Sequence, residues 1–166
     1  MTLRPFDDSR DRPLLRAWLA DPQVARWLTG HDGALTEADL DAWRDQPDAT
    51  RWVYAPEGVP LGYGELLAFP AAPYVRVARV LVDPARRIQG HGRALALALA
   101  AEARTRHPDW PIYTRITPDN HAALLAYPSV GFVALEPLPE GADDAYLWLV
   151  LMERDDDDPG GPLGDE

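Results

Sequence analysis

Residues 80–95, VLVDPARRIQGHGRAL, constrain the fold of this 166-residue chain more than any other stretch. A short apolar run stops at Asp83-Pro84, a basic turn with two glycines follows, and an Ala/Leu segment begins at Ala94. This order predicts a buried strand, a tight loop and the start of a helix. The first N–H groups of a helix have no partner within the helix, and the helix dipole adds positive charge, so this place favours an anion.

The charge of this stretch is opposite to that of the whole chain. The protein has 16 basic and 27 acidic residues, which give a formal net charge of −11. Residues 79–93 nevertheless hold four arginines and His91 against a single acid, Asp83. A basic loop in an acidic protein indicates an anionic ligand.

Residues 155–166 are the most acidic segment, with six acids and no base, and the chain without them has a charge of −5. Such a segment cannot bury apolar surface, so we expect a disordered, solubilising tail behind a single domain at residues 1–154. The domain itself is acidic, which argues against a nucleic-acid partner and is compatible with a cationic substrate.

Several chemistries are excluded by what the sequence lacks. There is no cysteine, and the two serines, Ser9 and Ser129, lie outside any G-x-S-x-G motif, so thiol and serine nucleophiles are not expected. The four histidines show no metal-binding spacing, and neither a P-loop nor a full G-x-G-x-x-G motif is present. No signal peptide and no apolar run of roughly 20 residues is found, so we expect a cytoplasmic protein without a metal or a membrane partner.

Hydrophobic periodicity and turn residues predict a mixed α/β (α+β) chain. Strands are expected at residues 2–6, 50–55, 61–68, 74–82, 112–117, 131–135 and 146–153. Helices are expected from Asp11 onward and at residues 24–28, 36–44, 94–106 and 120–127. The strands at 74–82 and 112–117 flank a crossover helix and should be parallel.

Three local features of these elements can be interpreted in more than one way. Residues 94–103 alternate Ala and Leu with period two, but their high helix propensity and the lack of β-branched residues favour a helix. Pro128 disfavours helical geometry at the preceding residue, which predicts that the last helix ends at Tyr127. Trp18 and Trp27, on the first two helices, are either core residues or a substrate wall.

A second motif, NHAALLAYPSVGF at residues 120–132, follows the strand at 112–117. Together with RIQGHG at residues 87–92, it resembles the GNAT superfamily of N-acetyltransferases over residues 1–154. The N-terminal residues LRPF at 3–6, with Trp18 and DPQVARW at 21–27, look like the branches that include aminoglycoside and ribosomal-protein acetyltransferases. The resemblance implies a GNAT-like acyl-CoA N-acyltransferase fold, with a mixed central sheet of six to seven strands flanked by helices.

The resemblance also implies acetyl-CoA as the co-substrate, without a metal. Backbone groups of Leu81 and Val82 would bind the pantetheine arm where their strand splays from its neighbour. Asn120 would contact the cofactor or, equally, cap its helix, and Arg86 or Arg87 would lie near the phosphates. The backbone amides expected around the pyrophosphate are those of Gln89, Gly90, His91, Gly92 and Arg93.

For the chemistry, the resemblance implies that Tyr127 protonates the leaving thiolate; otherwise it is a core tyrosine. The base is either water or a carboxylate. Arg76 stands near where the family often has an acid, so Glu65 is the best remaining candidate, unless it is simply an exposed strand residue. The amine would attack directly, because no residue suited to a covalent intermediate is present, and a backbone amide near Val82 would hold the oxyanion.

We therefore predict an acetyl-CoA-dependent N-acetyltransferase. Its acceptor is expected to be a primary amine of a small cationic molecule or of a protein N-terminus. The alternative is a catalytically weak acyl-CoA-binding regulatory module, which Arg76 and Pro128 favour. A homodimer is common in the family and is the assembly that the resemblance suggests.

Overall fold

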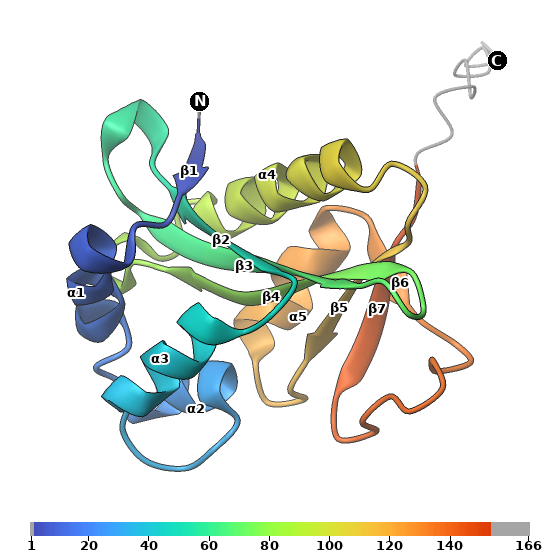
Figure 1. Cartoon of the computed structure of the whole chain (residues 1–166), viewed down its shortest axis with the longest axis horizontal. Coiled ribbons are helices and arrows are strands. Elements are labelled where there is room, and N and C mark those ends of the chain that lie inside the picture. Colours follow the sequence, from blue (N-terminus) through green and yellow to red (C-terminus); the bar gives the residue numbers. More distant parts are fainter. Residues whose placement is uncertain (1, 154–166) are drawn as a thin grey trace, which may run out of the picture.

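The computed structural model describes residues 2–153, in which seven strands form one sheet in the order β1-β2-β3-β4-β5-β7-β6 (Figure 1). The pair β4–β5 is parallel and all other neighbours are antiparallel. This confirms the mixed sheet and the parallel pair, whereas the acidic tail predicted at residues 155–166 lies outside the described residues. The strands are β1 (Leu3–Pro5), β2 (Ala49–Tyr54), β3 (Gly62–Phe69), β4 (Tyr74–Val82), β5 (Ile112–Ile116), β6 (Phe132–Ala134) and β7 (Leu147–Leu151).

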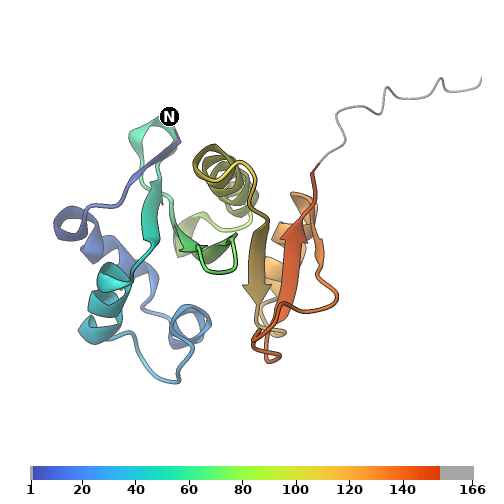
Figure 2. The same cartoon turned by 45° about the vertical axis from the view of Figure 1, so that its right-hand side comes forward.

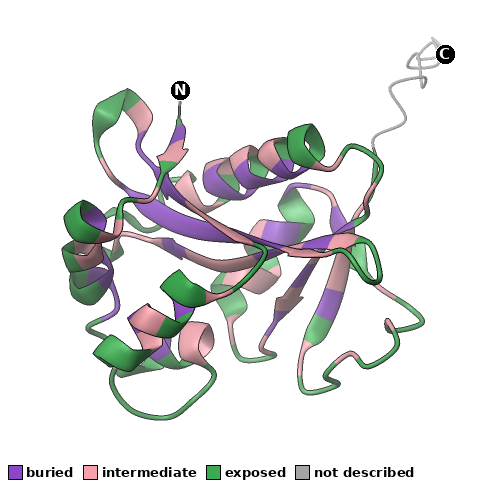
Figure 3. Cartoon of the chain, viewed as in Figure 1, coloured by how far each residue is buried: buried purple, intermediate pink, exposed green. Residues whose placement is uncertain are grey.

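Helices cover both faces of the sheet. One face packs against the first three helices around Tyr63 and Leu81, and the other packs against the last two around Val75 and Val77. Buried residues, purple in Figure 3, run along β3 and the sheet-facing side of the long helix above it. The helices are α1 (Asp8–Trp18), α2 (Pro22–Thr29), α3 (Glu37–Asp45), α4 (His91–Arg106) and α5 (His121–Ser129), with short 3-10 helices η1 (Pro56–Gly58) and η2 (Pro84–Arg86).

Side-chain caps decide where the first three helices begin. Helix α1 starts three residues before Asp11, because Asp7 accepts the Arg10 N–H at 2.9 Å. Asp11 is instead a buried helical residue, and its two oxygens accept hydrogen bonds of 2.7 and 2.9 Å from Arg4. Thr36 forms a capping box with Asp39 at the start of α3.

Helix α4 confirms that propensity outweighs the period-two pattern of its sequence. Its buried residues are Leu95, Ala96, Leu99, Ala100 and Ala103, which recur at helical spacing. The small residues bring α4 close to the sheet: a Cβ atom on Gly64 of β3 would lie 2.5 Å from a methyl group of Leu99.

Strands β4 and β5 separate soon after they pair. Their pairing extends only over Val75–Val77 and Ile112–Thr114, although β4 continues to Val82 and β5 to Ile116. On its other side, β4 has a bulge opposite β3, where Arg79 adopts a positive φ of 48°. The sheet therefore opens between β4 and β5, as the view in Figure 2 shows.

The prediction that the last helix ends at Tyr127 is wrong. Helix α5 continues through Pro128 to Ser129. Proline removes one backbone donor here, but it does so in the final turn, where Val130 and Gly131 bond three residues back, to Tyr127 and Pro128. Tyr127 therefore keeps a helical backbone, and its ring packs edge-on against Phe132 at 5.3 Å.

Candidate active site

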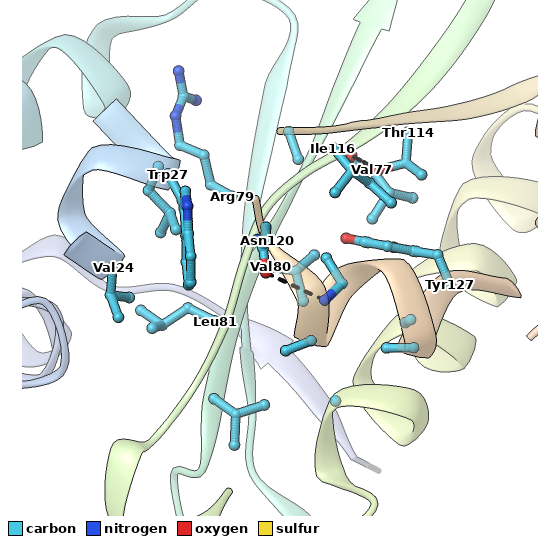
Figure 4. Close-up of a pocket in the computed structure, with 18 of the residues that line it drawn as sticks. Val24, Trp27, Val77, Arg79, Val80, Leu81, Thr114, Ile116, Asn120 and Tyr127 are labelled. Atoms are coloured by element: carbon cyan, nitrogen blue, oxygen red, sulfur yellow. Dashed lines mark hydrogen bonds between the residues drawn. The ribbon is translucent and has the colours of Figure 1, made fainter. Parts of the chain in front are cut away.

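A cavity of about 740 Å³ occupies the opening between β4 and β5. Its walls come from α2, β4, the loop before α4, the first turn of α4, β5 and α5. It therefore brings together the two motifs at residues 87–92 and 120–132 that lie far apart in the sequence. Figure 4 shows Val24 and Trp27 of α2 on one side of β4 and Tyr127 of α5 on the other.

The N-terminus of α4 forms one end of the cavity. Gly90 is the N-cap residue and adopts the left-handed conformation, with a φ of 80°, which glycine reaches without steric cost. No side chain caps this helix, so the N–H groups of its first turn remain available to an anion. Arg87, His91 and Arg93 line this end.

Most of the predicted cofactor-binding residues line the cavity, and one does not. The predicted residues that line it are Leu81, Val82, Arg87, Gly90, His91, Gly92, Arg93 and Asn120. Gln89 is exposed and is not among them. Arg86 lies beside Arg87, and both are exposed at the rim.

Asn120 has the capping role that was one of its two predicted functions. Its side-chain oxygen accepts the Ala123 N–H at 3.2 Å, drawn as a dashed line in Figure 4. The residue also lines the cavity, and the cap leaves its amide NH₂ group unused. Capping and ligand contact are therefore compatible.

Tyr127 is buried, and its hydroxyl points from α5 toward β4 (Figure 4). Burial raises the pKa of Tyr127 to about 12, so the phenol keeps its proton at neutral pH. Nearby, Thr114 of β5 donates its hydroxyl to the Val77 carbonyl at 3.0 Å, which bridges the two strands just before they separate. The Tyr127 hydroxyl thus lies near the point where the sheet opens.

Glu65 does not line the cavity. It is completely buried, so the interpretation of an exposed strand residue is wrong. Its carboxylate accepts hydrogen bonds from the Tyr63 hydroxyl and from Arg79, which also bonds Gln46 at 3.1 Å. Burial raises the pKa of Glu65. With both oxygens occupied, Glu65 has no geometric support as the base in this arrangement, and that role stays a prediction.

Arginines mark the other end of the cavity. Arg76 of β4 and Arg115 of β5 lie on the same sheet face, because Arg76 is paired with Tyr113, two residues before Arg115. Both line the cavity, as does Tyr146. Sequence reasoning noted Arg76 but missed Arg115 and Tyr146. The available signal for Arg115 was that both of two strands expected to be neighbours carry an arginine.

The two tryptophans have different roles. Trp18 of α1 is a core residue beside Leu15 and Tyr63. Trp27 of α2 lines the cavity, and its indole N–H donates to Asp119 at 3.2 Å. Because Asp119 precedes α5, this bond joins the helices on the two sides of the opening.

Residues 12–132 match the family model of the acetyltransferase (GNAT) family. The chain belongs to this family. Its fold is similar to that of aminoglycoside acetyltransferase AAC(6′)-Ib in complex with ribostamycin and coenzyme A, with a TM-score of 0.72, 21% identity, and coverage of 90% of this chain and 92% of that one. No match is found among curated protein sequences.

Two other solved GNAT structures have similar folds. The GNAT domain of S. lividans PAT gives a TM-score of 0.70 at 17% identity, covering 90% of this chain and 88% of that one. Spermidine N-acetyltransferase from Vibrio cholerae, in complex with CoA and spermine, gives 0.68 at 17% identity, covering 90% of each chain. These structures confirm the predicted fold. The family model identifies the protein as an acetyltransferase of the GNAT family.

Residues 2–153 lack both a membrane-crossing helix and a cluster of metal-binding side chains. No helix in this part of the chain is long and apolar enough to cross a membrane. The same residues contain no cluster of three or more His, Cys, Asp or Glu side chains that could bind a metal ion.

Proposed function

We propose that this GNAT enzyme transfers the acetyl group of acetyl-CoA to a primary amine by direct attack of the amine. One observation carries the proposal: a single cavity joins the free edge of β4, the uncapped N-terminus of α4 and the Tyr127 hydroxyl. These are an extended surface for an amide-containing arm, a site for phosphate, and a proton donor.

The cofactor would occupy the end of the cavity at α4. The amides around Gly90 and Gly92 would surround the pyrophosphate, and Arg87 would neutralise part of its charge. Backbone groups of Leu81 and Val82, which no strand pairs on the β5 side within the described residues, would bond the pantetheine arm. Asn120 would add its free amide group.

In the reaction, the neutral amine attacks the thioester carbonyl and forms a C–N bond. A backbone N–H near Val82 would hold the oxyanion, in the manner of other preorganised donors. The C–S bond then breaks, and the Tyr127 hydroxyl donates its proton to the leaving thiolate. Tyrosinate recovers a proton from solvent.

The amine must also lose a proton. No Asp or Glu lines the cavity within the described residues, so we propose that water takes this proton. Glu65 would then act as a positioning residue, since it holds Arg79 at the bulge of β4. The pH profile of kcat in Glu65→Gln distinguishes this positioning role from the predicted role of Glu65 as the base.

The neighbouring structures hold ribostamycin and spermine, which are both amines and agree with a small-molecule amine as the acceptor. A protein N-terminus is the other acceptor class expected from the sequence.

Calorimetric titration with acetyl-CoA, followed by measurement of thiol release and product mass with a panel of primary amines, tests the proposal. We expect saturable binding and an acetylated amine. Binding without turnover of any amine would instead support the acyl-CoA-binding module, and failure to bind acetyl-CoA would overturn both.

A further inference from the structure

The end of the cavity opposite α4, at Arg76 and Arg115, is called the acceptor end, and it holds an excess of positive charge. Arg76, Arg79 and Arg115 all line it, and Arg79 alone has a carboxylate partner, Glu65. In the described part of the chain, neither Arg76 nor Arg115 has an acidic oxygen within 4.0 Å. The imbalance is notable in a protein with a net charge of −11.

Aromatic rings hold these two guanidinium groups in place. Arg115 lies 4.1 Å from the centre of the Tyr146 ring, and Arg76 lies 5.5 Å from that of Phe69. Both arginines are 5.9 Å from the ring of Trp148. Stacking uses the faces of a guanidinium group and leaves its N–H donors at the edge free.

Arg76 is also short of hydrogen-bond partners. Its Nε atom is buried and has no acceptor. Burial, reinforced by the charge of Arg115, lowers the pKa of Arg76 to about 10, which still leaves it protonated at neutral pH. A buried donor without an acceptor is costly, so an acceptor supplied by a ligand would be favourable here.

We propose that the acceptor of this enzyme is a small amine that also carries an anionic group, a carboxylate or a phosphate, which Arg76 and Arg115 bind. This inference rests on the proposed function and names its substrate class. Arginine pairs suit both anions, because each guanidinium presents parallel N–H donors to two oxygens. A polycationic acceptor would instead face the positive charges of Arg76 and Arg115, and no acid lines the cavity among the described residues. The proposal therefore differs from the cationic acceptor that the overall charge led us to expect.

Matched acceptors test the proposal with the full chain and acetyl-CoA. The set compares β-alanine with β-alaninamide, O-phosphoethanolamine with ethanolamine, and both pairs with spermidine. We expect kcat/KM to be at least about tenfold higher for the anionic member of one pair, which also shows whether carboxylate or phosphate is preferred. Equal or faster acetylation of the partner without the anion in both pairs, or acetylation of spermidine at least as fast as that of both anionic amines, would overturn the proposal.

Substitutions test the residues. Arg115→Gln and Arg76→Gln should each raise KM for the preferred anionic amine at least about tenfold, while the affinity for acetyl-CoA stays unchanged. Arg104→Gln, on the exposed side of α4, is the matched control and should change neither quantity. If Arg76→Gln does not fold, Arg115→Gln alone decides, and an unchanged KM would overturn the assignment.

Failure of the proposed function is distinguishable from failure of this inference. If no amine is acetylated, calorimetric titration of the CoA-loaded protein with β-alanine, O-phosphoethanolamine and their partners without an anionic group still compares the ligands. Tighter binding of an anionic member, lost in Arg115→Gln, supports the anion site without turnover. Equal binding within both pairs, or binding of neither anion, overturns it.

Discussion

The two ends of the cavity are formed by different kinds of chemical group. The end at α4 is formed mainly by backbone: a glycine in the left-handed conformation, the free N–H groups of a helix, and a strand edge. The end at Arg76 and Arg115 is formed by charged side chains on neighbouring strands, held by aromatic rings. The first arrangement follows from a few consecutive residues, whereas the second depends on how distant strands align.

The two ends also differ in their exposure to water. Arg86 and Arg87 at the cofactor end are exposed, whereas Arg76 and Arg115 are half-buried. Charges act more strongly where water is partly excluded, and salt screens them less. We therefore expect the exposed arginines to contribute modestly to phosphate binding and the half-buried ones to decide which acceptor is accepted.

Tyr127→Phe removes the proposed proton donor, and it should have the largest effect. We expect kcat to fall about 10²- to 10⁴-fold, the usual contribution of a general acid, with little change in acetyl-CoA affinity. Tyr113→Phe, on β5 but outside the cavity lining, is the control. An unchanged kcat would show that Tyr127 is only a core tyrosine.

The raised pKa of Tyr127 gives the same assignment a pH signature. The acid is active while protonated, and its pKa is about 12. A loss of kcat through deprotonation of Tyr127 should therefore be absent between pH 7 and pH 10, whereas a fall of kcat across this range would contradict the assignment.

Glu65→Gln tests the buried ion pair between Glu65 and Arg79. It leaves Arg79 without its buried counter-charge, so we expect the free energy of unfolding in urea to fall by about 3 kcal/mol. The exposed Glu140→Gln is the control.

The kinetics of the same variant separate its two candidate roles. If Glu65 is a positioning residue, the shape of the pH profile of kcat persists. If Glu65 is the base, the acidic limb of that profile disappears.

Asp11→Asn tests how much the ion pairs of Asp11 in helix α1 contribute to the stability of the fold. Burial alone would raise the pKa of Asp11, but hydrogen bonds from Arg4, the Asp7 N–H and Arg10 lower it to about 2. Its contribution of about 2 kcal/mol is present above the unfolded pKa of 3.8 and is lost as pH falls through 2. Unfolding measured from pH 6 to pH 2 should therefore show a smaller loss of stability in Asp11→Asn than in the wild type or in the exposed control Asp109→Asn.

Gly90→Ala tests the backbone-built end and should have the smallest effect. The left-handed conformation costs a non-glycine residue about 1–2 kcal/mol, so we expect a loss of stability of that size together with weaker acetyl-CoA binding. Gly58→Ala is a close control, because Gly58 is also left-handed, with a φ of 79°, but lies outside the cavity. If both variants lose affinity equally, the loop at Gly90 is not the phosphate site.

The sequence predicted most strands, helix α4 and the glycine-containing loop before it, because periodicity, propensity and glycine spacing act over short distances. It failed where the answer depends on tertiary context. Pro128 was tolerated because it falls in a final turn. The alternative that Glu65 is an exposed strand residue was wrong, because pairing of β3 with β4 buries it beside Arg79. Arg115 was missed because its neighbour Arg76 is 39 positions away in the chain.

The early separation of β4 and β5 has a consequence for folding as well as for catalysis. A ligand lying along the free edge of β4 would supply the contacts that a further strand would otherwise make. Any ligand that binds the folded form alone stabilises it by mass action, by about 2.7 kcal/mol at 100 times its dissociation constant. The cellular supply of acetyl-CoA would then set the lifetime of this protein against unfolding and proteolysis, in addition to its rate of turnover.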